Sequence, residues 1–487
     1  MQPDVSSPAQ LHTFRMKEKL ADLTPGMQTH GLRANAMGLL GAVTLGVVML
    51  SPAMTLYACF GPAYLAAGKS STLAFVWALL ATLPTAASYA LLSHQFPSSG
   101  SAASWISRAC LPLGSTGAWI GRWAGWIVFL YYLNNFIIQP VTLGLFFNDL
   151  LTSLGVSVGF FTFVTGAVIC CAWPARLVFR GIQSSAHGAL RFLLIETGVV
   201  IALCATIAFV GHRDGVRFGA EGFTVAASPT GMHGMFGALL FGVLSFCGYD
   251  VISTLSEETR TPSRLIPQAT FLALLCFGAL MIGGVWLLGY AVSPERLREV
   301  SESGGMPITE IARAYWGKGA ILVPIVAISA SLGLAIATSV GTSRVLFSMA
   351  REGSAPERFA TLSERTRSPT ATLVLVFAVG FVAAVGVAAC AGSFNAYVWW
   401  CTTVTFFALC TYLLVNLSAL MLFGRRAFRS PSSFFLHGVV PLFGFAVDGY
   451  ILVRAFFIEL WGEGFRGRSV IFFALGSAAL AGLIARR

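Results

Sequence analysis

An apolar stretch at residues 237–255 is long enough to cross a lipid bilayer as a helix. It nevertheless carries Ser245, Gly248 and Asp250 near its middle. A carboxylate at that depth costs about 2.5–3.5 kcal/mol even on lenient insertion scales, so it should face protein or water. Glycine lowers the cost of leaving helical geometry, and freed backbone inside a membrane is tolerated only around a cavity or within protein. The stretch therefore predicts a broken helix whose opened turn contacts a solute.

The composition indicates that this stretch belongs to a membrane protein. Of the 487 residues, 56% are hydrophobic and 10% are charged, and the mean hydropathy is +0.77, as in chains that cross the bilayer many times. The net charge of +11 does not indicate nucleic-acid binding, because the basic residues are scattered among apolar segments. The ten cysteines show no CxxC pattern, so we expect packing residues, no metal site and no cofactor.

Twelve apolar segments are long enough to cross the membrane, which predicts an all-α membrane protein. Between the seventh and eighth segments, the acid-rich residues 293–319 predict a short surface helix over an outer vestibule. The expected membrane spans are residues 37–67, 71–93, 118–149, 157–178, 188–211, 232–256, 268–292, 319–347, 371–391, 394–423, 437–459 and 468–485.

The distribution of basic residues predicts the orientation of these spans. With the N-terminus inside, about two thirds of the 31 Lys and Arg residues fall on cytoplasmic segments, which agrees with the positive-inside rule. Residues 1–36 are polar and lack an apolar core, so we expect a cytoplasmic tail and no cleavable signal peptide. An even number of spans then places both termini in the cytoplasm.

The first span is also interrupted, by Pro52. Proline removes a backbone donor and clashes with the preceding turn, so this helix should break as well, unless Pro52 only kinks a packed helix. Interruptions in both the first and the sixth span are typical of a transporter built from two inverted repeats, with the site between them. We therefore expect a first repeat at residues 37–211, a second repeat at 212–423, and two further helices with the C-terminus at 424–487.

Several stretches resemble the amino acid–polyamine–organocation permeases. The most specific is LSFCGYDVISTLSEETRTPSRLIPQAT at residues 244–270, which is similar to the sixth span and following loop of bacterial putrescine-type importers. Residues 54–61, 96–101 and 343–353 agree with the same family. The resemblance implies a five-plus-five inverted repeat of the LeuT-like fold with broken helices 1 and 6. It also implies a place in the bacterial inner membrane and uptake of small amines or amino acids, commonly driven by protons.

The chain departs from the putrescine-type pattern at two positions. Ala58 stands where those relatives have an aspartate, and Tyr131 stands at a second usual aspartate if the Gly125-Trp126 pair sets the register. A diamine needs an anionic partner at both ends, because a buried unpaired ammonium is costly. The glycine-serine-glycine run of many amino-acid permeases is also replaced, by residues 51–53. We therefore expect a small amino acid or a monoamine, with a polyamine as the alternative.

The two opened turns provide most of the expected substrate contacts. A half-helix N-terminus at residues 51–54 suits a carboxylate, and freed carbonyls at residues 245–249 suit an amine. Tyr131 and Asn135 lie four residues apart and so share a helix face. The aromatic side chains at the second break can equally be packing residues, and the Thr402 hydroxyl can donate to a carbonyl of its own helix. The candidate substrate-binding residues are Ser51, Pro52, Ala53, Met54, Tyr57, Tyr131, Asn135, Ser245, Phe246, Cys247, Gly248, Tyr249 and Thr402.

Two acids within the spans are candidate proton carriers. Glu196 lies in the fifth span, at a position where the resemblance implies a lysine that stands in for a sodium ion; a salt bridge to an inner arginine is the alternative role. Asp250 lies where some relatives carry another acid on the sixth span. Asp448, outside the repeats, is expected to pair with Arg454.

Charged residues after the sixth span form a candidate inner gate. Glu257, Glu258 and Arg264 follow the span, and Arg344 lies near the inner end of the eighth span if the repeat is right. We expect these charges to form contacts that break when the site opens inward. Surface charges usually contribute little to stability, so this expectation rests on the motif.

These features favour a secondary active transporter that imports a small amino acid or monoamine by alternating access, coupled to a proton. Alternatives are a polyamine importer, an amino acid or amine exchanger, a channel or a transceptor, and sodium coupling through Ser339 and Thr342 stays open. Isolated histidines and the lack of a GxxxxGK[ST] motif argue against an enzyme or an ATP-driven pump. Expected partners are the substrate, the proton and the bilayer, with no nucleic acid, for a monomer or dimer.

Overall fold

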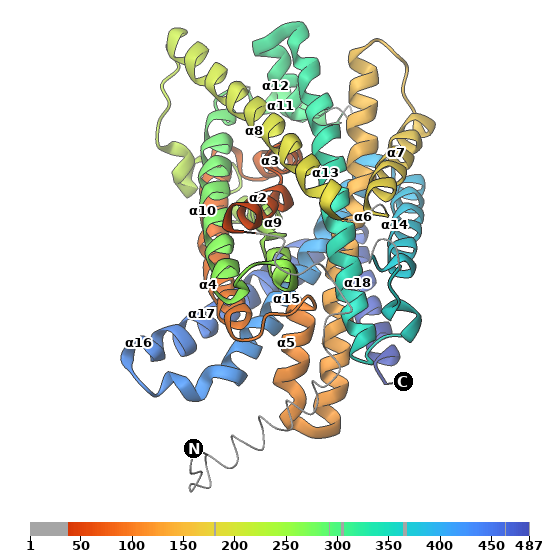
Figure 1. The fold of residues 1–487 in the computed structure, drawn as a ribbon. Helices are drawn as coiled ribbons and strands as arrows, with labels where there is room; N and C mark the ends of the chain where they lie inside the picture. Colours follow the sequence, from red (N-terminus) through yellow and green to blue (C-terminus); the bar gives the residue numbers. More distant parts are fainter. Residues whose placement is uncertain are drawn as a thin grey trace, which may run out of the picture.

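The computed structural model describes residues 38–179, 182–291, 293–302, 306–363, 368–462 and 464–486. These residues form helices and connecting turns, and no β-strand occurs among them. Figure 1 shows the longer helices bundled side by side, with the C-terminal end at the same end of the bundle as α5. The α-helices are α2 (Leu39–Leu50), α3 (Pro52–Ala67), α4 (Ser71–Gln95), α5 (Ser101–Cys110), α6 (Gly114–Ser153), α7 (Phe160–Val178), α8 (Ile182–Arg213), α9 (Met232–Phe246), α10 (Pro262–Leu288), α11 (Pro294–Glu302), α12 (Pro307–Trp316), α13 (Leu322–Arg351), α14 (Thr370–Ala391), α15 (Ser393–Ala427), α16 (Pro431–Phe434), α17 (Val440–Leu452) and α18 (Phe465–Ile484).

Eleven helical stretches of the described chain are long and apolar enough to cross a membrane. The first of them, Leu39–Gln95, contains 57 residues. A helix of that length would extend about 85 Å, far beyond a hydrocarbon core of about 30 Å. Gly68, with φ of +58°, ends α3 before α4 begins, so we count this stretch as two spans. The total then corresponds to the twelve spans that the sequence predicts.

The first span is broken at Ser51, between α2 and α3. Ser51 has φ of +40° and ψ of 90°, which is not helical, and Pro52 occupies the first position of α3. Proline is favourable there because the first helical N–H has no partner within the helix. The Thr55 hydroxyl donates to the carbonyl of Leu50 at 2.5 Å and so caps one of the carbonyls that the break leaves free. The predicted interruption of the first span is confirmed.

The sixth span is broken directly after α9. Cys247 is extended, with φ of −66° and ψ of 130°, and Gly248 has φ of +121°, after which a 3₁₀ helix, η5 (Tyr249–Glu258), continues the chain. A Cβ atom on Gly248 would lie 3.0 Å from the backbone oxygen of Met49 on α2. Glycine is therefore required both for the conformation and for the close approach of the two broken spans. The predicted interruption of the sixth span is confirmed.

The four half-helices pack against one another in pairs. α3 lies along α9, and α2 lies against both α10 and η5. The long helix α6 makes its most extensive contacts with α13 and α15, so it forms a wall beside the broken spans. The two breaks thus meet in the interior of the bundle, at one level of the fold, rather than at its surface.

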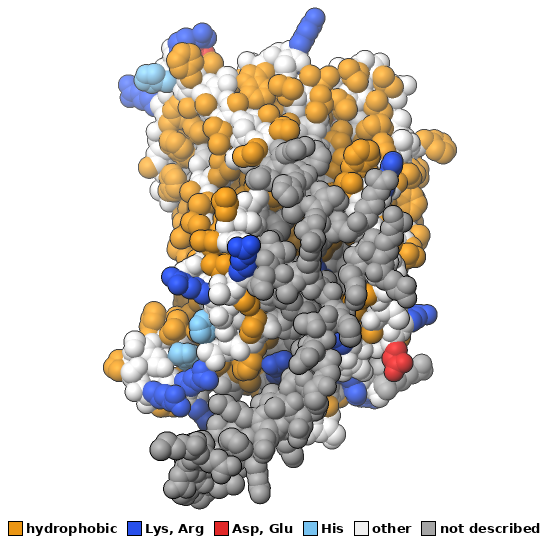
Figure 2. All heavy atoms as spheres, viewed as in Figure 1, with side chains coloured by type: hydrophobic (Ala, Val, Ile, Leu, Met, Phe, Trp, Pro, Cys, Tyr) orange, Lys and Arg blue, Asp and Glu red, His pale blue; other side chains and the backbone are white. Residues whose placement is uncertain are grey.

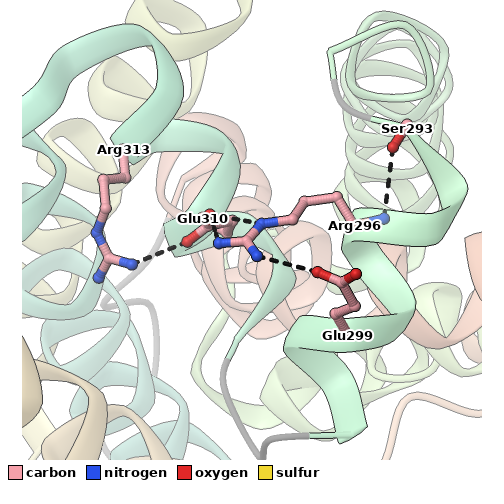
Figure 3. Close-up of polar contacts among 5 residues, drawn as sticks. All are labelled: Ser293, Arg296, Glu299, Glu310 and Arg313. Atoms are coloured by element: carbon pink, nitrogen blue, oxygen red, sulfur yellow. Dashed lines mark hydrogen bonds and ion pairs between the residues drawn. The ribbon is translucent and has the colours of Figure 1, made fainter.

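Two short helices, α11 and α12, connect α10 to α13, where the sequence predicts one. One ion pair joins them, between Arg296 on α11 and Glu310 on α12 at 2.8 Å. Within the helices, Arg296 also contacts Glu299 at 3.0 Å and Arg313 contacts Glu310 at 2.8 Å (Figure 3). Hydrogen bonds to Glu310 and then Glu299 raise the pKa of the exposed Arg296 guanidinium. Exposed pairs of this kind contribute little to stability, so they fix the register of the two helices more than they hold the fold.

Tighter contacts attach these two helices to the bundle. The Thr309 hydroxyl donates to the Asp149 carboxylate at the end of α6, at 2.6 Å. Pro307 packs on Gly61 of α3 so closely that a Cβ atom there would lie 2.7 Å from the proline ring. The segment therefore lies across the end of the first span, at the place where the sequence predicts a cover over a vestibule.

The exterior of the molecule matches a membrane environment. Figure 2 shows hydrophobic side chains over much of the upper part of one face, whereas Lys and Arg side chains are more frequent in its lower part. Large apolar side chains such as Phe161, Phe209 and Val382 are more than two thirds exposed. Such exposure is unfavourable in water but favourable against lipid.

Replacing Gly248 with alanine should destabilise the protein, because the added Cβ atom meets the Met49 carbonyl and the φ angle is unfavourable for it. We expect a loss of about 1–3 kcal/mol, measured as a lower apparent melting temperature of the purified protein in detergent. Gly283→Ala is the matched control, since a Cβ atom there meets nothing within 4 Å. Equal melting temperatures for the two variants would contradict the role assigned to Gly248.

Candidate functional site

A cavity of about 60 Å³ lies where the two broken spans meet. Its wall combines both sides of the first break, the end of α9, and facing turns of α6, α13 and α15. The position follows from the breaks themselves, because helices that stop short of one another leave space that backbone and small side chains line. The lining residues are Met49, Leu50, Met54, Thr55, Ala58, Cys59, Asn135, Ile138, Gln139, Leu244, Cys247, Leu334, Tyr397 and Cys401.

Three of the predicted substrate-binding residues line this cavity. Met54 comes from the first turn of α3, Asn135 from α6 and Cys247 from the extended residue at the second break. Ala58, noted as a missing aspartate, also lies in the wall. Sequence reasoning missed Gln139, although it lies one helical turn beyond Asn135 and so shares its face.

The chemistry of the wall is neutral. None of its described lining residues carries a charge, and five of them contain sulfur: Met49, Met54, Cys59, Cys247 and Cys401. The polar groups are the hydroxyls of Thr55 and Tyr397 and the amides of Asn135 and Gln139. An ion would be poorly stabilised by these side chains alone, whereas a small ligand with an apolar part can pack against them.

The first break brings Glu196 into contact with α3. The Ser51 hydroxyl donates to Glu196 Oε2 at 2.8 Å, across two helices, and Glu196 is only 3% exposed. Ser51 is the N-cap residue of α3, so the carboxyl lies beside the positive end of that half-helix. The structure thus joins two features that the sequence predicts separately. A salt bridge from Glu196 to an arginine is not among the contacts of the described residues, which leave out the side chain of Arg191.

The second break is held by hydrogen bonds to Asp250. Its carboxylate accepts from Tyr132 at 2.6 Å, from Tyr131 at 2.9 Å and from the Gly248 amide at 3.2 Å, with Tyr412 of α15 at 3.5 Å. Asp250 is 1% exposed, so these contacts replace its hydration. The carboxylate therefore connects η5 to α6 and α15.

The tyrosines around Asp250 are arranged differently from the sequence prediction. The sequence predicts that Tyr131 and Asn135 act together on one helix face, but the Tyr131 hydroxyl donates to Asp250, and the neighbouring Tyr132 donates to the same carboxylate. This is possible because η5 lies against α6 closely enough for both tyrosines to reach it. Tyr412 had no signal in the sequence, since an isolated tyrosine in an apolar span is indistinguishable from a packing residue.

The remaining predicted substrate-binding residues lie outside the lining of the cavity. Ser245 and Thr402 donate to carbonyls of their own helices, at 2.7 Å each. Phe246 packs edge-on against Phe277 of α10, with ring centroids 5.6 Å apart. The other members of this group are buried around the two breaks, and they are Ser51, Pro52, Ala53, Tyr57, Gly248 and Tyr249.

The residues of the expected inner gate are only partly described. Arg344 is buried within α13, whereas Arg264 at the start of α10 is exposed. The side chains of Glu257 and Glu258 lie outside the described part of the chain. On η5, the 3₁₀ helix that carries Glu257 and Glu258, the hydroxyl of Ser253 contacts the hydroxyl of Ser101 at the start of α5.

The expected pairing of Asp448 with Arg454 is wrong. Arg454 contacts Glu459 at 2.8 Å, and Asp448 accepts from the Thr85 hydroxyl at 2.7 Å and the Asn416 amide at 3.1 Å. A spacing of six residues places two side chains on different faces of a helix, so they turn to different neighbours. Asp448 therefore belongs to a buried polar cluster that joins α17 to α4 and α15.

Comparisons with known proteins agree with this architecture. A sequence profile described as "Amino acid permease" matches residues 40–477. The chain is 27% identical over 445 residues to the low-affinity putrescine importer PlaP of Escherichia coli (strain K12), which covers 89% of this chain and 91% of that protein. It is 26% identical over 333 residues to the branched-chain amino acid permease BcaP of Bacillus subtilis (strain 168), covering 63% and 66% respectively.

The fold is also that of a solved structure. The crystal structure of the Eremococcus coleocola manganese transporter matches with a TM-score of 0.58 at 10% identity, over 95% of this chain and 99% of that one. This likeness shows the LeuT-like fold, with its inverted repeat and broken first and sixth helices. Together with the profile, which spans most of the sequence, it leads to one conclusion: the chain belongs to the amino acid permease family of membrane transporters, and it is not an enzyme.

Proposed function

We propose that this transporter imports a small neutral amino acid or a monoamine by alternating access. The observation that carries the proposal is a cavity at the meeting point of two broken helices, whose described lining residues are all uncharged. The N-terminus of α3 offers backbone N–H groups to a carboxylate, and the end of α9 offers free carbonyls to an ammonium. A zwitterion can therefore be bound at both of its charges by backbone, without any charged side chain in the wall.

The same proposal assigns a role to the larger units of the chain. Residues 37–211 and 212–423 are the two repeats that move relative to each other, and residues 424–487 are an addition outside them. Both termini face the cytoplasm of a bacterial inner membrane. On that side, the gate consists of Glu257 and Glu258 with Arg264 and Arg344, while the α11–α12 segment covers the opposite end. The transport unit is one chain, alone or in a dimer.

Glu196 is the group that we assign to proton coupling. Its carboxyl lies at the N-cap of α3, beside the position proposed for the substrate carboxylate. When Glu196 is ionised, a substrate carboxylate at the same helix end meets a second negative charge, and protonation removes this repulsion. Binding of the proton and binding of the substrate then favour each other, and such linkage is reciprocal.

Asp250 is the second candidate for the proton, but its surroundings favour a different role. Two tyrosine hydroxyls and one backbone amide already donate to the carboxylate within 3.2 Å. Donors of this kind stabilise the ionised form, and a proton on Asp250 would displace one of them. We therefore assign Asp250 to holding η5 against α6, and leave the proton to Glu196.

Putrescine import is the competing function, because the relative PlaP is named for it. A diamine carries two ammonium groups, and none of the described residues that line the cavity is acidic and could pair with either of them. Transport assays distinguish the proposed coupled importer from a channel and from an exchanger. Counterflow of labelled substrate requires a carrier that returns loaded, and net accumulation under a pH gradient requires coupling.

Uptake into proteoliposomes should be driven by a pH gradient that is acidic outside. If one proton enters with each substrate molecule, a gradient of about one pH unit provides about 1.4 kcal/mol per transport cycle. This free energy supports up to about tenfold accumulation of the substrate. Labelled alanine, leucine and butylamine are suitable probes, with putrescine as the competing class. Accumulation with a sodium gradient but none with a pH gradient would refute proton coupling.

Glu196→Gln should abolish accumulation under the pH gradient while substrate binding and counterflow persist, because the amide keeps the contact with Ser51 but cannot exchange a proton. Asp448→Asn is the matched control, since Asp448 is also a buried carboxyl with hydroxyl and amide partners but lies outside the cavity wall. The measurement is the ratio of internal to external label at steady state. An unchanged ratio in Glu196→Gln would remove this residue from coupling.

Tyr132→Phe should lower the melting temperature of the purified protein, because it removes one donor to the buried Asp250 carboxylate. The expected loss is about 1–3 kcal/mol, the cost of leaving a buried polar group without a partner. Tyr89→Phe provides the comparison, since the Tyr89 hydroxyl is equally buried and has no hydrogen-bond partner among the described residues. If both variants melt alike, Asp250 does not anchor the break.

A further inference from the structure

Gln139 on α6 presents a polar atom for which the described chain provides no partner. Its side chain is 4% exposed and lines the cavity between the two breaks. The amide nitrogen donates to the backbone oxygen of Asn135 at 3.1 Å. The other end of the amide, Oε1, is buried and makes no hydrogen bond within the described residues.

The orientation of this amide follows from its partner. A backbone carbonyl can only accept, so the NH₂ group of Gln139 must face Asn135 and Oε1 must be the atom left over. A buried acceptor without a donor costs free energy, and such groups are rare in folded proteins. When one occurs in the wall of a binding cavity, a ligand that supplies the missing donor removes that cost.

The rest of the wall limits what kind of donor this can be. Apart from the polar groups of Thr55, Asn135 and Tyr397, the described wall around Gln139 is apolar or sulfur-containing, and it includes no carboxylate. Thr55 already donates its hydroxyl to Leu50, so it too can only accept from a ligand. Gln139 and Thr55 therefore offer neutral acceptors, and the described side chains of the wall provide no negative charge.

We propose that Gln139 Oε1 accepts a hydrogen bond from the ammonium group of the substrate, and that the neutral amide at this position restricts the substrate to a single ammonium. A diamine would place its second ammonium against apolar and sulfur-containing side chains, without a counter-charge. This inference rests on the proposed function and deepens it, because it names the residue that selects the charge of the substrate.

The test compares butylamine with putrescine, which share a four-carbon chain and differ by one ammonium group. Binding of each is measured as the ligand-dependent rise in melting temperature of the full-length purified protein, and as inhibition of labelled substrate uptake. The wild-type protein should bind butylamine more tightly. Gln139→Glu places a carboxylate in the wall and should shift the affinity ratio toward putrescine by about tenfold or more.

Asn134→Asp is the control for the change of amide to carboxylate. Asn134 lies on the same helix, is 2% exposed and has a buried Oδ1 without a partner among the described residues, but it does not line the cavity. Its substitution should leave the ratio between the two amines unchanged. An equal shift in Asn134→Asp and Gln139→Glu would overturn the inference, because the effect would then reflect added charge anywhere near α6.

Gln139→Met gives a second measurement that does not depend on burying a charge. This substitution keeps the length of the side chain and removes the acceptor. It should weaken butylamine binding about tenfold, while the melting temperature of the ligand-free variant stays equal to that of the ligand-free wild-type protein. Unchanged amine affinity in this variant, or an unchanged ratio in Gln139→Glu, refutes the role of Gln139 and leaves the transporter proposal intact. If the wild-type protein transports and binds no amine or amino acid, the proposed function itself fails.

Discussion

The structure depends on satisfying one carboxylate far from water. Asp250 follows the residue that breaks the sixth span, and in a bilayer its charge must be met by protein groups. Tyr131 and Tyr132 on α6, together with the Gly248 amide, provide those groups. The same hydrogen bonds fix where η5 begins relative to α6, so the position of the cavity wall follows from how this charge is solvated.

The acids and the cavity are kept apart. Glu196 contacts the N-cap of α3 and Asp250 contacts tyrosines, yet neither lines the cavity, whose described wall residues are neutral. Under the function proposed above, backbone dipoles bind the charges of the substrate directly, while a titratable group nearby changes the strength of that binding. A third buried acid, Asp448, joins α17 to α4 and α15 through hydroxyl and amide groups. Selectivity and coupling can therefore be altered by different residues.

Local features of the sequence predicted the breaks well and the contacts less well. Pro52 and Gly248 restrict the backbone by themselves, so their effects were predictable without knowledge of any neighbour. Tyr131 and Asp250 were both singled out, but as members of separate sites, and their hydrogen bond depends on how η5 packs against α6. The pairing of Asp448 with Arg454 failed because closeness in sequence within one helix does not place two side chains on one face.

The sequence by itself determined the class of protein, the approximate spans and the two interruptions, because hydrophobic length and backbone restriction are local properties. The tertiary structure alone decided which polar side chains meet. Gln139 is an ordinary amide in an apolar segment until the ends of α2, α3 and α9 enclose a cavity beside it. Its oxygen, which has no partner among the described residues, and the contact of Ser51 with Glu196 both arise from packing between helices distant in sequence. No periodic pattern in a single helix encodes such an arrangement.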